Sequence, residues 1–410
     1  PNSEDFARGY AFELAKGQSV QFTIRSEAGG NLNFYGPRTE RHPGPVERYQ
    51  EQPIESHSIS GGEPLETAVE ASGSGWYLVL FYNRYEASGV TIEWSCETKC
   101  AGRQQLVGQL EDHLDDHGGR EAFELPDESD YDAIPQDPQN PLSAAKVELG
   151  RLLFHETGLA VRPENEELGE GTYSCAACHR AEFGFRAGHP QGISEGGSGY
   201  WDREKNPNYD ESSVDALPIA PPTTLNGAYQ EVMLWNGQFG ANGLNDGTEG
   251  RWERGTPTEW NKLDFLGPEI LGITGLRVHR MSIVESDIVD NSTYVELFNE
   301  AFDQQQVEDL ADEERLYQEL AQRADFTEGY RSSTSSGNGE EVENYEDEPI
   351  SDLKAGLAIA AYLRATLANE APFQKWLRGE EDAMTMAELR GANVFFSEEK
   401  GNCVACHSGP

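Results

Sequence analysis

A five-residue pattern, Cys-x-x-Cys-His, occurs twice in this chain and constrains its fold more than any other feature. The copies occupy residues 175–179 and 403–407, and together they use four of the six cysteines. Two thiols three positions apart can each form a thioether with one edge of a porphyrin, and the next residue then presents an imidazole to the iron. The pattern therefore predicts two covalently bound c-type haems. The residues predicted to attach the haems and to ligate their irons are Cys175, Cys178, His179, Cys403, Cys406 and His407.

Two other uses of paired cysteines fit this pattern less well. Paired Cys-x-x-Cys motifs that bind zinc usually lie ~15–20 residues apart, whereas more than half of the chain separates these two copies. A thioredoxin-like redox pair would leave the histidine that directly follows both motifs unexplained. Haem attachment accounts for both the spacing and the histidine.

The composition is that of a globular protein with more than one core, since 37% of the 410 residues are hydrophobic. No run approaches eighteen apolar residues, so we expect no membrane span. The 73 acidic and 31 basic side chains give a net charge of −42, which argues against nucleic acid or an anionic membrane as a partner. The charge would attract a basic electron donor, but it equally fits a surface adapted to salty water.

The cysteine chemistry also predicts where the protein is found. Haem attachment to Cys-x-x-Cys-His takes place outside the cytoplasm, yet no signal peptide begins at Pro1. We therefore expect the numbering of a mature, exported protein in the periplasm or outside the cell. An oxidising compartment favours a disulfide between the two remaining cysteines, Cys96 and Cys100; free thiols or pairing with another chain are the alternatives.

Residues 1–100 alternate apolar and polar side chains in short runs, such as Val20, Phe22 and Ile24. This period-two pattern predicts half-buried antiparallel strands that form a small β-sandwich. The stretches 33–37, 75–77 and 92–96 resemble the pre-peptidase C-terminal type of accessory domain, which implies an accessory or adhesive role. His42 and His57 are interpreted as loop residues in this region.

The rest of the chain contains helical signals that are repeated before each haem motif. Residues 101–140 are acidic, and the stretch 111–117 is interpreted as a solvated linker helix rather than a metal site. Ser143 caps a helix that leads into the first motif, and Thr385 with Glu388 forms a capping box before the second. Residues 353–367 predict a helix at the centre of the core, and residues 331–347 a mobile surface loop.

Residues from about 130 to 410 resemble the bacterial di-haem cytochrome c peroxidase family, which includes enzymes that mature a tryptophan-derived quinone in a partner protein. Besides the haem motifs, the matching stretches are 141–150, 222–226, 234–237, 358–367 and 371–373. The resemblance implies a peroxidatic haem in the first unit and an electron-entry haem in the second. It also implies that hydrogen peroxide is the substrate and that a small redox protein, such as a cytochrome c, is the donor.

The resemblance completes the predicted fold class, which is multidomain: an N-terminal all-β sandwich followed by mostly α-helical c-type cytochrome domains. The predicted parts are the sandwich at 1–100, an acidic linker at 101–140, the first haem domain at 141–375 and the start of the second at 376–410. The chain ends three residues after His407, where the family continues, so the second haem domain is expected to be truncated. A homodimer is a further expectation.

Several positions in the predicted active site depart from the family. Its distal glutamine falls at Ile270, and its glutamate falls at His279 or Arg280, so this pair is predicted to do the acid-base work. A histidine satisfied in the core beside a surface arginine, and His279 as a sixth iron ligand, are the alternatives. Trp235 matches the aromatic residue that the family places between the haems, with a purely structural core tryptophan as the alternative.

Two further departures concern ligands. The distal histidine that caps the first iron in many relatives falls at Glu195, so the first iron is expected to be open; His189 lies six residues earlier and could replace it. The family's interdomain calcium site loses support, because a donating asparagine falls at Ala220. The leading function is therefore a secreted di-haem peroxidase. An electron-transfer protein with both irons six-coordinate, and a di-haem oxidase that modifies a partner protein or an organic substrate, are the alternatives.

Overall fold

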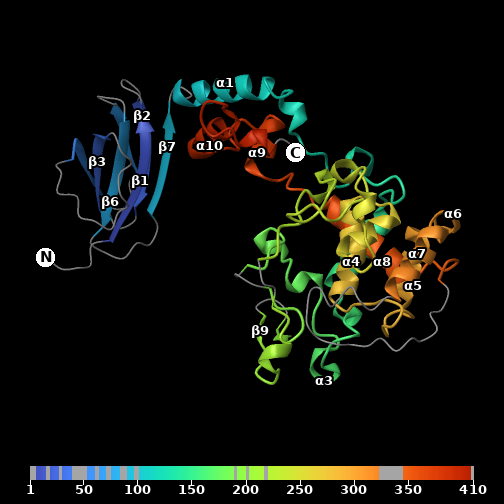
Figure 1. Cartoon of the computed structure of the whole chain (residues 1–410). Coiled ribbons are helices and arrows are strands. Elements are labelled where there is room, and N and C mark those ends of the chain that lie inside the picture. Colours follow the sequence, from blue (N-terminus) through green and yellow to red (C-terminus); the bar gives the residue numbers. More distant parts are fainter. Residues whose placement is uncertain are drawn as a thin grey trace. The chain divides into compact units, whose positions relative to one another are not determined.

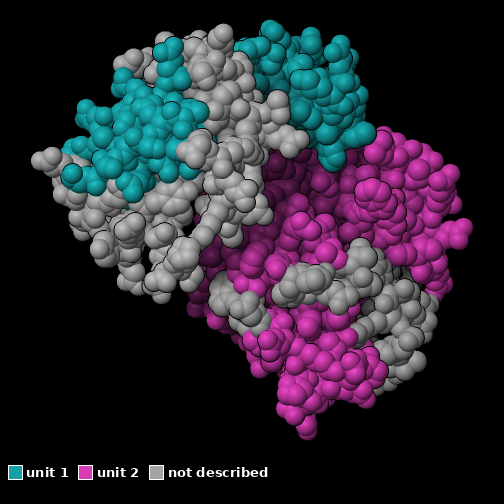
Figure 2. Space-filling view, turned by 90° about the vertical axis from the view of Figure 1, so that its left-hand side faces the viewer, with its two compact units in different colours: residues 1–122, 381–408 teal, residues 123–380, 409–410 magenta. Residues whose placement is uncertain are grey.

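The computed structural model of the chain falls into two compact units, which Figure 2 colours separately. The first contains residues 1–122 and 381–408, and the second contains residues 123–380 with 409–410. The predicted domain boundaries stay a prediction. The residues that the structure describes are 6–14, 19–26, 30–38, 53–60, 64–70, 75–83, 90–96, 101–188, 192–199, 203–216, 220–322 and 345–407.

The N-terminal region consists of short antiparallel strands, as the alternating pattern predicts (Figure 1). The strands are β1 (Phe6–Leu14), β2 (Ser19–Ser26), β3 (Gly30–Arg38), β4 (Glu55–Ile59), β5 (Leu65–Glu70), β6 (Gly75–Asn83) and β7 (Val90–Cys96). They pair in the orders β1-β6-β3-β4 and β5-β2-β7. Alternate residues of β2 are buried, and one hydrophobic cluster draws on both sheets, with the rings of Phe22 and Phe34 5.1 Å apart.

Some predictions for this region fall outside what the structure describes. His42, Cys100 and the side chain of Cys96 are not among the described residues, so the disulfide stays a prediction. The interpretation of His57 as a loop residue is wrong, because it lies in β4 and its Nε2 is 3.1 Å from the hydroxyl of Thr67 in β5. Histidine fits there because its ring packs edge-on against Phe34.

Two helices far apart in sequence pack together in the first unit (Figure 1). Helix α1 (Ala101–Asp115) lies against α10 (Met386–Phe396), and Asn393 of α10 donates a hydrogen bond to the carbonyl of Leu106 at 2.9 Å. The capping box of Thr385 and Glu388 is confirmed. Leu110 and Leu114 of α1 are completely buried, whereas the other residues of the stretch 111–117 are not, so its role as a linker stays a prediction.

The second unit is mainly helical and is built around one buried helix, α8. Its helices are α2 (Ala144–His155), α3 (Glu166–Gly169), α4 (Gly267–Val278), α5 (Ser292–Ala301), α6 (Gln304–Asp309), α7 (Ala311–Ala321), α8 (Asp352–Ala365) and α9 (Pro372–Leu377), with a short pair of strands, β8 (Gly197–Ser198) and β9 (Glu204–Lys205). The predicted cap of α2 is confirmed, since Ser143 Oγ accepts a hydrogen bond from the backbone N–H of Lys146.

Among the described residues, no helix combines the length and apolarity that a membrane crossing needs. The predicted loop at 331–347 lies almost entirely outside the described residues.

Helix α8 packs against both α2 and α4, and glycines make these approaches close. A Cβ on Gly150 of α2 would overlap the carbonyl oxygen of Ala358, and one on Gly272 of α4 would lie 2.5 Å from the carbonyl oxygen of Gly356. Real Cβ atoms do not approach backbone atoms this closely. The two contacts therefore require glycine for packing rather than for backbone flexibility.

Buried polar groups fix the ends of α8. Near its start, Lys354 Nζ lies 3.1 Å from Glu314 of α7, and both side chains are fully buried. Near its end, Arg364 donates two hydrogen bonds to Glu269 of α4, at 2.7 and 2.5 Å. Breaking one partner of such a pair leaves a buried charge uncompensated, which typically costs about 3–5 kcal/mol. These pairs therefore fix the position of α8 along its neighbours.

Substituting alanine at two glycines of α4 should separate close packing from helix propensity. Gly272→Ala should lower the free energy of unfolding by ~1–3 kcal/mol, because its methyl group overlaps the backbone of α8. Gly275→Ala, one turn along the same helix, meets nothing within 4 Å and should be neutral or stabilise by up to ~1 kcal/mol. Denaturant unfolding of both variants measures the difference, and equal effects would refute the packing argument.

Lys146 of α2 should make stability depend on pH above neutrality. It is buried, its Nζ donates to the carbonyl of Pro141 at 2.9 Å, and burial lowers its pKa from 10.5 to about 8. Below pH 8 the cost of burying the charge is fully present; between pH 8 and 10.5 the folded state loses the proton first, so stability rises. The unfolding free energy of the wild type, relative to Lys146→Met, should therefore rise by up to about 3 kcal/mol across that window. A difference that does not change with pH would contradict this.

Candidate functional site

The first Cys-x-x-Cys-His motif is a single tight turn beside α2. Residues Cys175–Ala177 form the 3₁₀ turn η4, in which the carbonyl of Cys175 accepts from the backbone N–H groups of Cys178, at 3.1 Å, and His179, at 2.9 Å. Cys178 is buried and Cys175 half-buried, and burial raises the pKa of each thiol to about 12. The turn thus presents the two thiols and the imidazole from a short, fixed length of backbone.

The second motif repeats this backbone almost unchanged. Turn η12 (Cys403–Ala405) is closed by hydrogen bonds of 3.1 and 2.9 Å from Cys406 and His407 to the carbonyl of Cys403. The dihedrals are also alike, with φ −116° and ψ −21° at Cys406 and φ −111° and ψ −22° at Cys178. Its Cys403, Cys406 and His407 are exposed. Gly401 holds the turn against α10, since a Cβ there would overlap the carbonyl oxygen of Val394.

The surroundings of His179 prepare it as an iron ligand. Its Nδ1 lies 3.0 Å from the carbonyl of Phe185, and the ring of Phe154, at the end of α2, has its centroid 6.4 Å away. An Nδ1–H that donates to this carbonyl fixes the tautomer in which Nε2 is free to bind a metal. Burial lowers the pKa of His179, which favours the neutral ring that ligates iron.

The residues near the first motif fit a bound haem. Within the described part of the chain, Ser174 Oγ, Thr224 Oγ1 and His279 Nδ1 are buried without a hydrogen-bond partner. Buried polar atoms are normally satisfied by protein, water or a ligand. Because Ser174 directly precedes the attachment turn, its unpaired hydroxyl fits a site that a bound group and its water complete.

The predicted acid-base pair, His279 and Arg280, lies at the end of α4. The hydroxyl of Tyr173 donates to the carbonyl of His279 at 2.9 Å. Burial lowers the pKa of His279, and the carboxylate of Asp215 opposes that effect. Arg280 has φ +57°, a left-handed backbone that typically costs a non-glycine residue ~1–3 kcal/mol. The alternative of a surface arginine is wrong, because the side chain of Arg280 is only 16% exposed and its guanidinium binds the fully buried Glu195.

Glu195 is the centre of this cluster and is fully buried. Its carboxylate accepts hydrogen bonds from Arg280 at 2.6 and 3.1 Å, from the hydroxyl of Tyr209 at 2.8 Å and from the backbone of Asn165 at 3.0 Å. Arg280 also lies 3.3 Å from Asp215. The structure therefore brings Glu195 into contact with Arg280, two positions that the sequence analysis singled out separately.

Asp215 and Tyr209 were missed by the sequence reasoning. Backbone hydrogen bonds between the Glu195 segment and the Asp215 segment, 2.9 and 3.0 Å long, join stretches that have no periodic pattern. Ser194 Oγ donates to Asp215 at 2.6 Å. Because the chain is so rich in acidic residues, nothing in the sequence near Asp215 distinguishes it from the others. Only the contacts of the folded loop identify it as part of the cluster.

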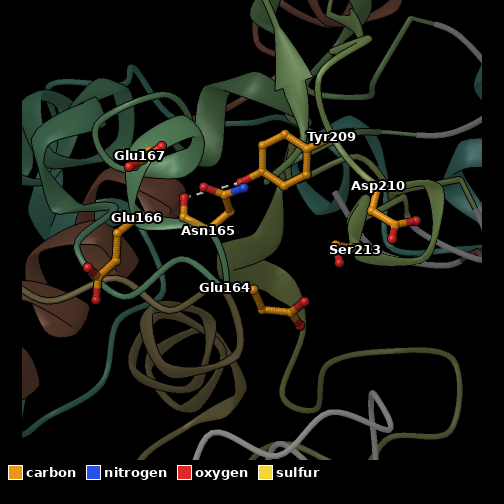
Figure 3. A pocket seen from close by; sticks show the side chains of 7 residues that line it. All are labelled: Glu164, Asn165, Glu166, Glu167, Tyr209, Asp210 and Ser213. Atoms are coloured by element: carbon orange, nitrogen blue, oxygen red, sulfur yellow. Dashed lines mark hydrogen bonds between the residues drawn. The ribbon is translucent and has the colours of Figure 1, made fainter.

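A surface pocket lies on the outer side of Tyr209 (Figure 3). Its volume is about 420 Å³, and most of its lining is acidic. The hydroxyl of Tyr209 faces Asn165, whose carbonyl is 3.4 Å away, while Glu166 and Glu167 point away from Tyr209. Burial and Glu195 raise the pKa of Tyr209, so its hydroxyl stays protonated and donates. The residues that line the pocket are Glu164, Asn165, Glu166, Glu167, Tyr209, Asp210 and Ser213.

The remaining predicted residues receive less support from the structure. The side chain of Trp235 is fully exposed, beside Leu234 with φ +68°, so the alternative of a buried core tryptophan is wrong and its place between the haems stays a prediction. His189 lies outside the described residues. Within the described ranges, no group of three or more His, Cys, Asp or Glu side chains could hold a metal ion such as calcium.

Comparison with known proteins agrees with this geometry. The model of the di-haem cytochrome c peroxidase family matches residues 144–382. The methylamine utilization protein MauG of Methylophilus methylotrophus is 27% identical over 289 residues, which are 70% of this chain and 58% of that protein. The cytochrome c peroxidase Ccp of Escherichia coli is 24% identical over 276 residues, 67% of this chain and 39% of that protein.

The chain spans about half the length of the curated relatives it matches. The family match includes the first attachment turn, α2, α4 and α8, and the second turn beyond it has the same backbone. On this match and on two attachment turns folded alike, the chain belongs to the di-haem cytochrome c peroxidase family.

Proposed function

We propose that this protein is an exported di-haem peroxidase that reduces hydrogen peroxide to water with electrons from an external redox protein. Each peroxide takes up two electrons and two protons and yields two waters. Membership of the family implies an oxidoreductase with two c-type haems. When bound, haem iron supplies the place where peroxide binds and the route by which electrons arrive. The protein must supply the protons and stabilise developing charge.

The observation that carries the proposal is the cluster of Glu195, Arg280 and Asp215 next to His279, with Glu195 fully buried at its centre. An electron carrier needs no buried acid-base cluster, because its irons exchange only electrons. A peroxidase needs groups that hold and move protons at fixed positions, since peroxide cleavage transfers a proton from one oxygen to the other. Three donors hold Glu195 in a single orientation, which supports this requirement.

Within the cluster we assign different roles to neighbouring residues. His279 moves the proton, because its buried Nδ1 has no partner within the described residues and imidazole exchanges protons near neutral pH. Arg280 fixes the carboxylate of Glu195 and places positive charge where negative charge develops. Asp215 favours the protonated form of His279 and so offsets part of the effect of burial.

A second candidate function is an oxidase that modifies a partner protein or an organic substrate. It is favoured by the similarity to two MauG proteins, at 27% and 23% identity. Both functions share the first haem site, and they differ in what supplies the electrons. Stopped-flow mixing with peroxide, with and without a reduced cytochrome c, separates them: a peroxidase turns over many times only when the donor is present.

For the N-terminal region we propose a β-sandwich with an accessory role. The hydrophobic cluster shared by the two sheets, from Val20 to Phe81, supports this architecture. The domain boundaries predicted from the sequence are kept as part of the proposal, with the second haem domain starting near residue 376. A homodimer and a position of Trp235 between the two haems are further proposals.

The purified protein should carry two covalent haems. The pyridine haemochrome assay should give two c-type haems per chain, and haem staining should persist on a denaturing gel after acid-acetone extraction, because thioethers survive both treatments. Replacing Cys175 and Cys178 together by Ala should leave one haem, and so should the same change at Cys403 and Cys406. Cys96→Ser serves as the control and should keep both; loss of stain from the wild type would end the claim.

Substitutions in the cluster should slow the reaction with peroxide. His279→Ala should slow it by ~10²–10⁴-fold, the usual contribution of general acid-base catalysis. Glu195→Gln keeps the shape but removes the charge that Arg280 binds, and should also slow the reaction. Arg280→Lys should cost less than His279→Ala, because the charge stays although the planar fork is lost. The exposed Glu170→Gln is the control; a normal rate for His279→Ala would reject its role.

A further inference from the structure

Arg203 is a buried arginine that directly precedes β9. Among the described residues, its side chain donates hydrogen bonds to backbone carbonyls. It is 5% exposed. Its Nε donates to Ile193 at 2.8 Å, its Nη1 to Thr172 and Gly199 at 2.6 and 2.8 Å, and its Nη2 to Ser194 and Gly197 at 2.6 and 2.9 Å. These bonds account for all five N–H groups of a guanidinium.

The carbonyls that Arg203 binds belong to two functional stretches. Four lie between residues 193 and 199, on both sides of Glu195. The fifth, on Thr172, precedes Tyr173, whose hydroxyl binds the carbonyl of His279. The side chain of Arg203 therefore connects the segment that carries Glu195 with the stretch of backbone that leads into the first haem-attachment turn.

This segment also lies unusually close to the attachment turn. A Cβ on Gly192 would be 2.5 Å from the sulfur of Cys178. Apart from β8 and a single bridge between Ile193 and Ala216, the segment is irregular, so several of its carbonyls need partners from outside a helix or sheet. Burial lowers the pKa of Arg203. Lysine has three donors on one atom and cannot match this planar arrangement.

We infer that Arg203 is a positioning residue, which holds segment 192–199 in one conformation so that Glu195 meets Arg280 beside His279. The inference rests on the proposed function, because only in that function does the position of Glu195 matter for the reaction. It adds a residue that touches none of the reacting groups and acts through the backbone. The segment is then a fixed wall of the site rather than an element that rearranges during turnover.

Hydrogen exchange in the holoprotein tests the first half of this inference. In Arg203→Lys the backbone amides of residues 192–199 should exchange at least roughly tenfold faster than in the wild type, because the carbonyls lose their common partner. Arg103→Lys is the matched control: Arg103 also binds backbone carbonyls, those of Met384 and Glu381, but in the other compact unit. Unchanged exchange in segment 192–199 would overturn the inference.

A double-mutant cycle tests the second half. Arg203→Lys should slow the reaction with peroxide by roughly 10–100-fold in the wild-type background, and should add nothing in the Glu195→Gln background, because both changes remove the same placement of the carboxylate. Additive effects would mean that Arg203 is only structural. If Arg203→Lys fails to fold, Gly197→Ala replaces it, since its Cβ would press on Nε of Arg203 at 2.8 Å.

The two failures can be told apart. A wild-type holoprotein that does not react with peroxide rejects the proposed function, while the exchange experiment still decides whether Arg203 holds the segment. A wild-type protein that reacts normally, together with Glu195→Gln that also reacts normally, rejects the positioning of Glu195 by Arg203 and leaves the peroxidase in place.

Discussion

The close approach of α8 to α2 and α4 is the constraint on which the haem-binding unit depends. Gly150 and Gly272 let the backbone of α8 lie against its two neighbours, and the buried pairs of Lys354 with Glu314 and Arg364 with Glu269 fix its position along them. Interiors packed this tightly do not deform gradually. The positions of both sides of the candidate site therefore depend on α8, although α8 contributes no residue to the proposed chemistry.

The two neighbours of α8 carry the two halves of that site. Helix α2 ends at Phe154 and His155, where the ring of Phe154 lies beside His179. Helix α4 ends at Val278, and His279 and Arg280 follow it directly. Because α8 packs against both α2 and α4, it also influences the distance between His179 and His279, the residues proposed as iron ligand and acid-base group. The loop that carries Glu195 contacts Arg280, and its carbonyls accept hydrogen bonds from Arg203.

Charge is used differently in the core and in the candidate site. In the two pairs on α8, each buried cation forms an ion pair with one carboxylate, so the charges balance. In the site, Arg280 meets two carboxylates, Glu195 and Asp215, next to a histidine whose Nδ1 has no partner among the described residues. The site also contains the left-handed backbone of Arg280. A left-handed backbone and unbalanced charge thus occur together where proton transfer is proposed, as is common at functional sites.

The sequence by itself determined the local features: the two attachment turns, the alternating strands, the cap at Ser143 and the capping box at Thr385. Each depends on residues within a few positions of one another, so spacing alone predicts it. The burial of α1 against α10, the exposure of Trp235, and the meeting of Glu195 with Arg280, Asp215 and Tyr209 were decided only by the tertiary structure. These contacts join residues separated by up to 287 positions through irregular loops and backbone carbonyls, which leave no periodic signal in the sequence.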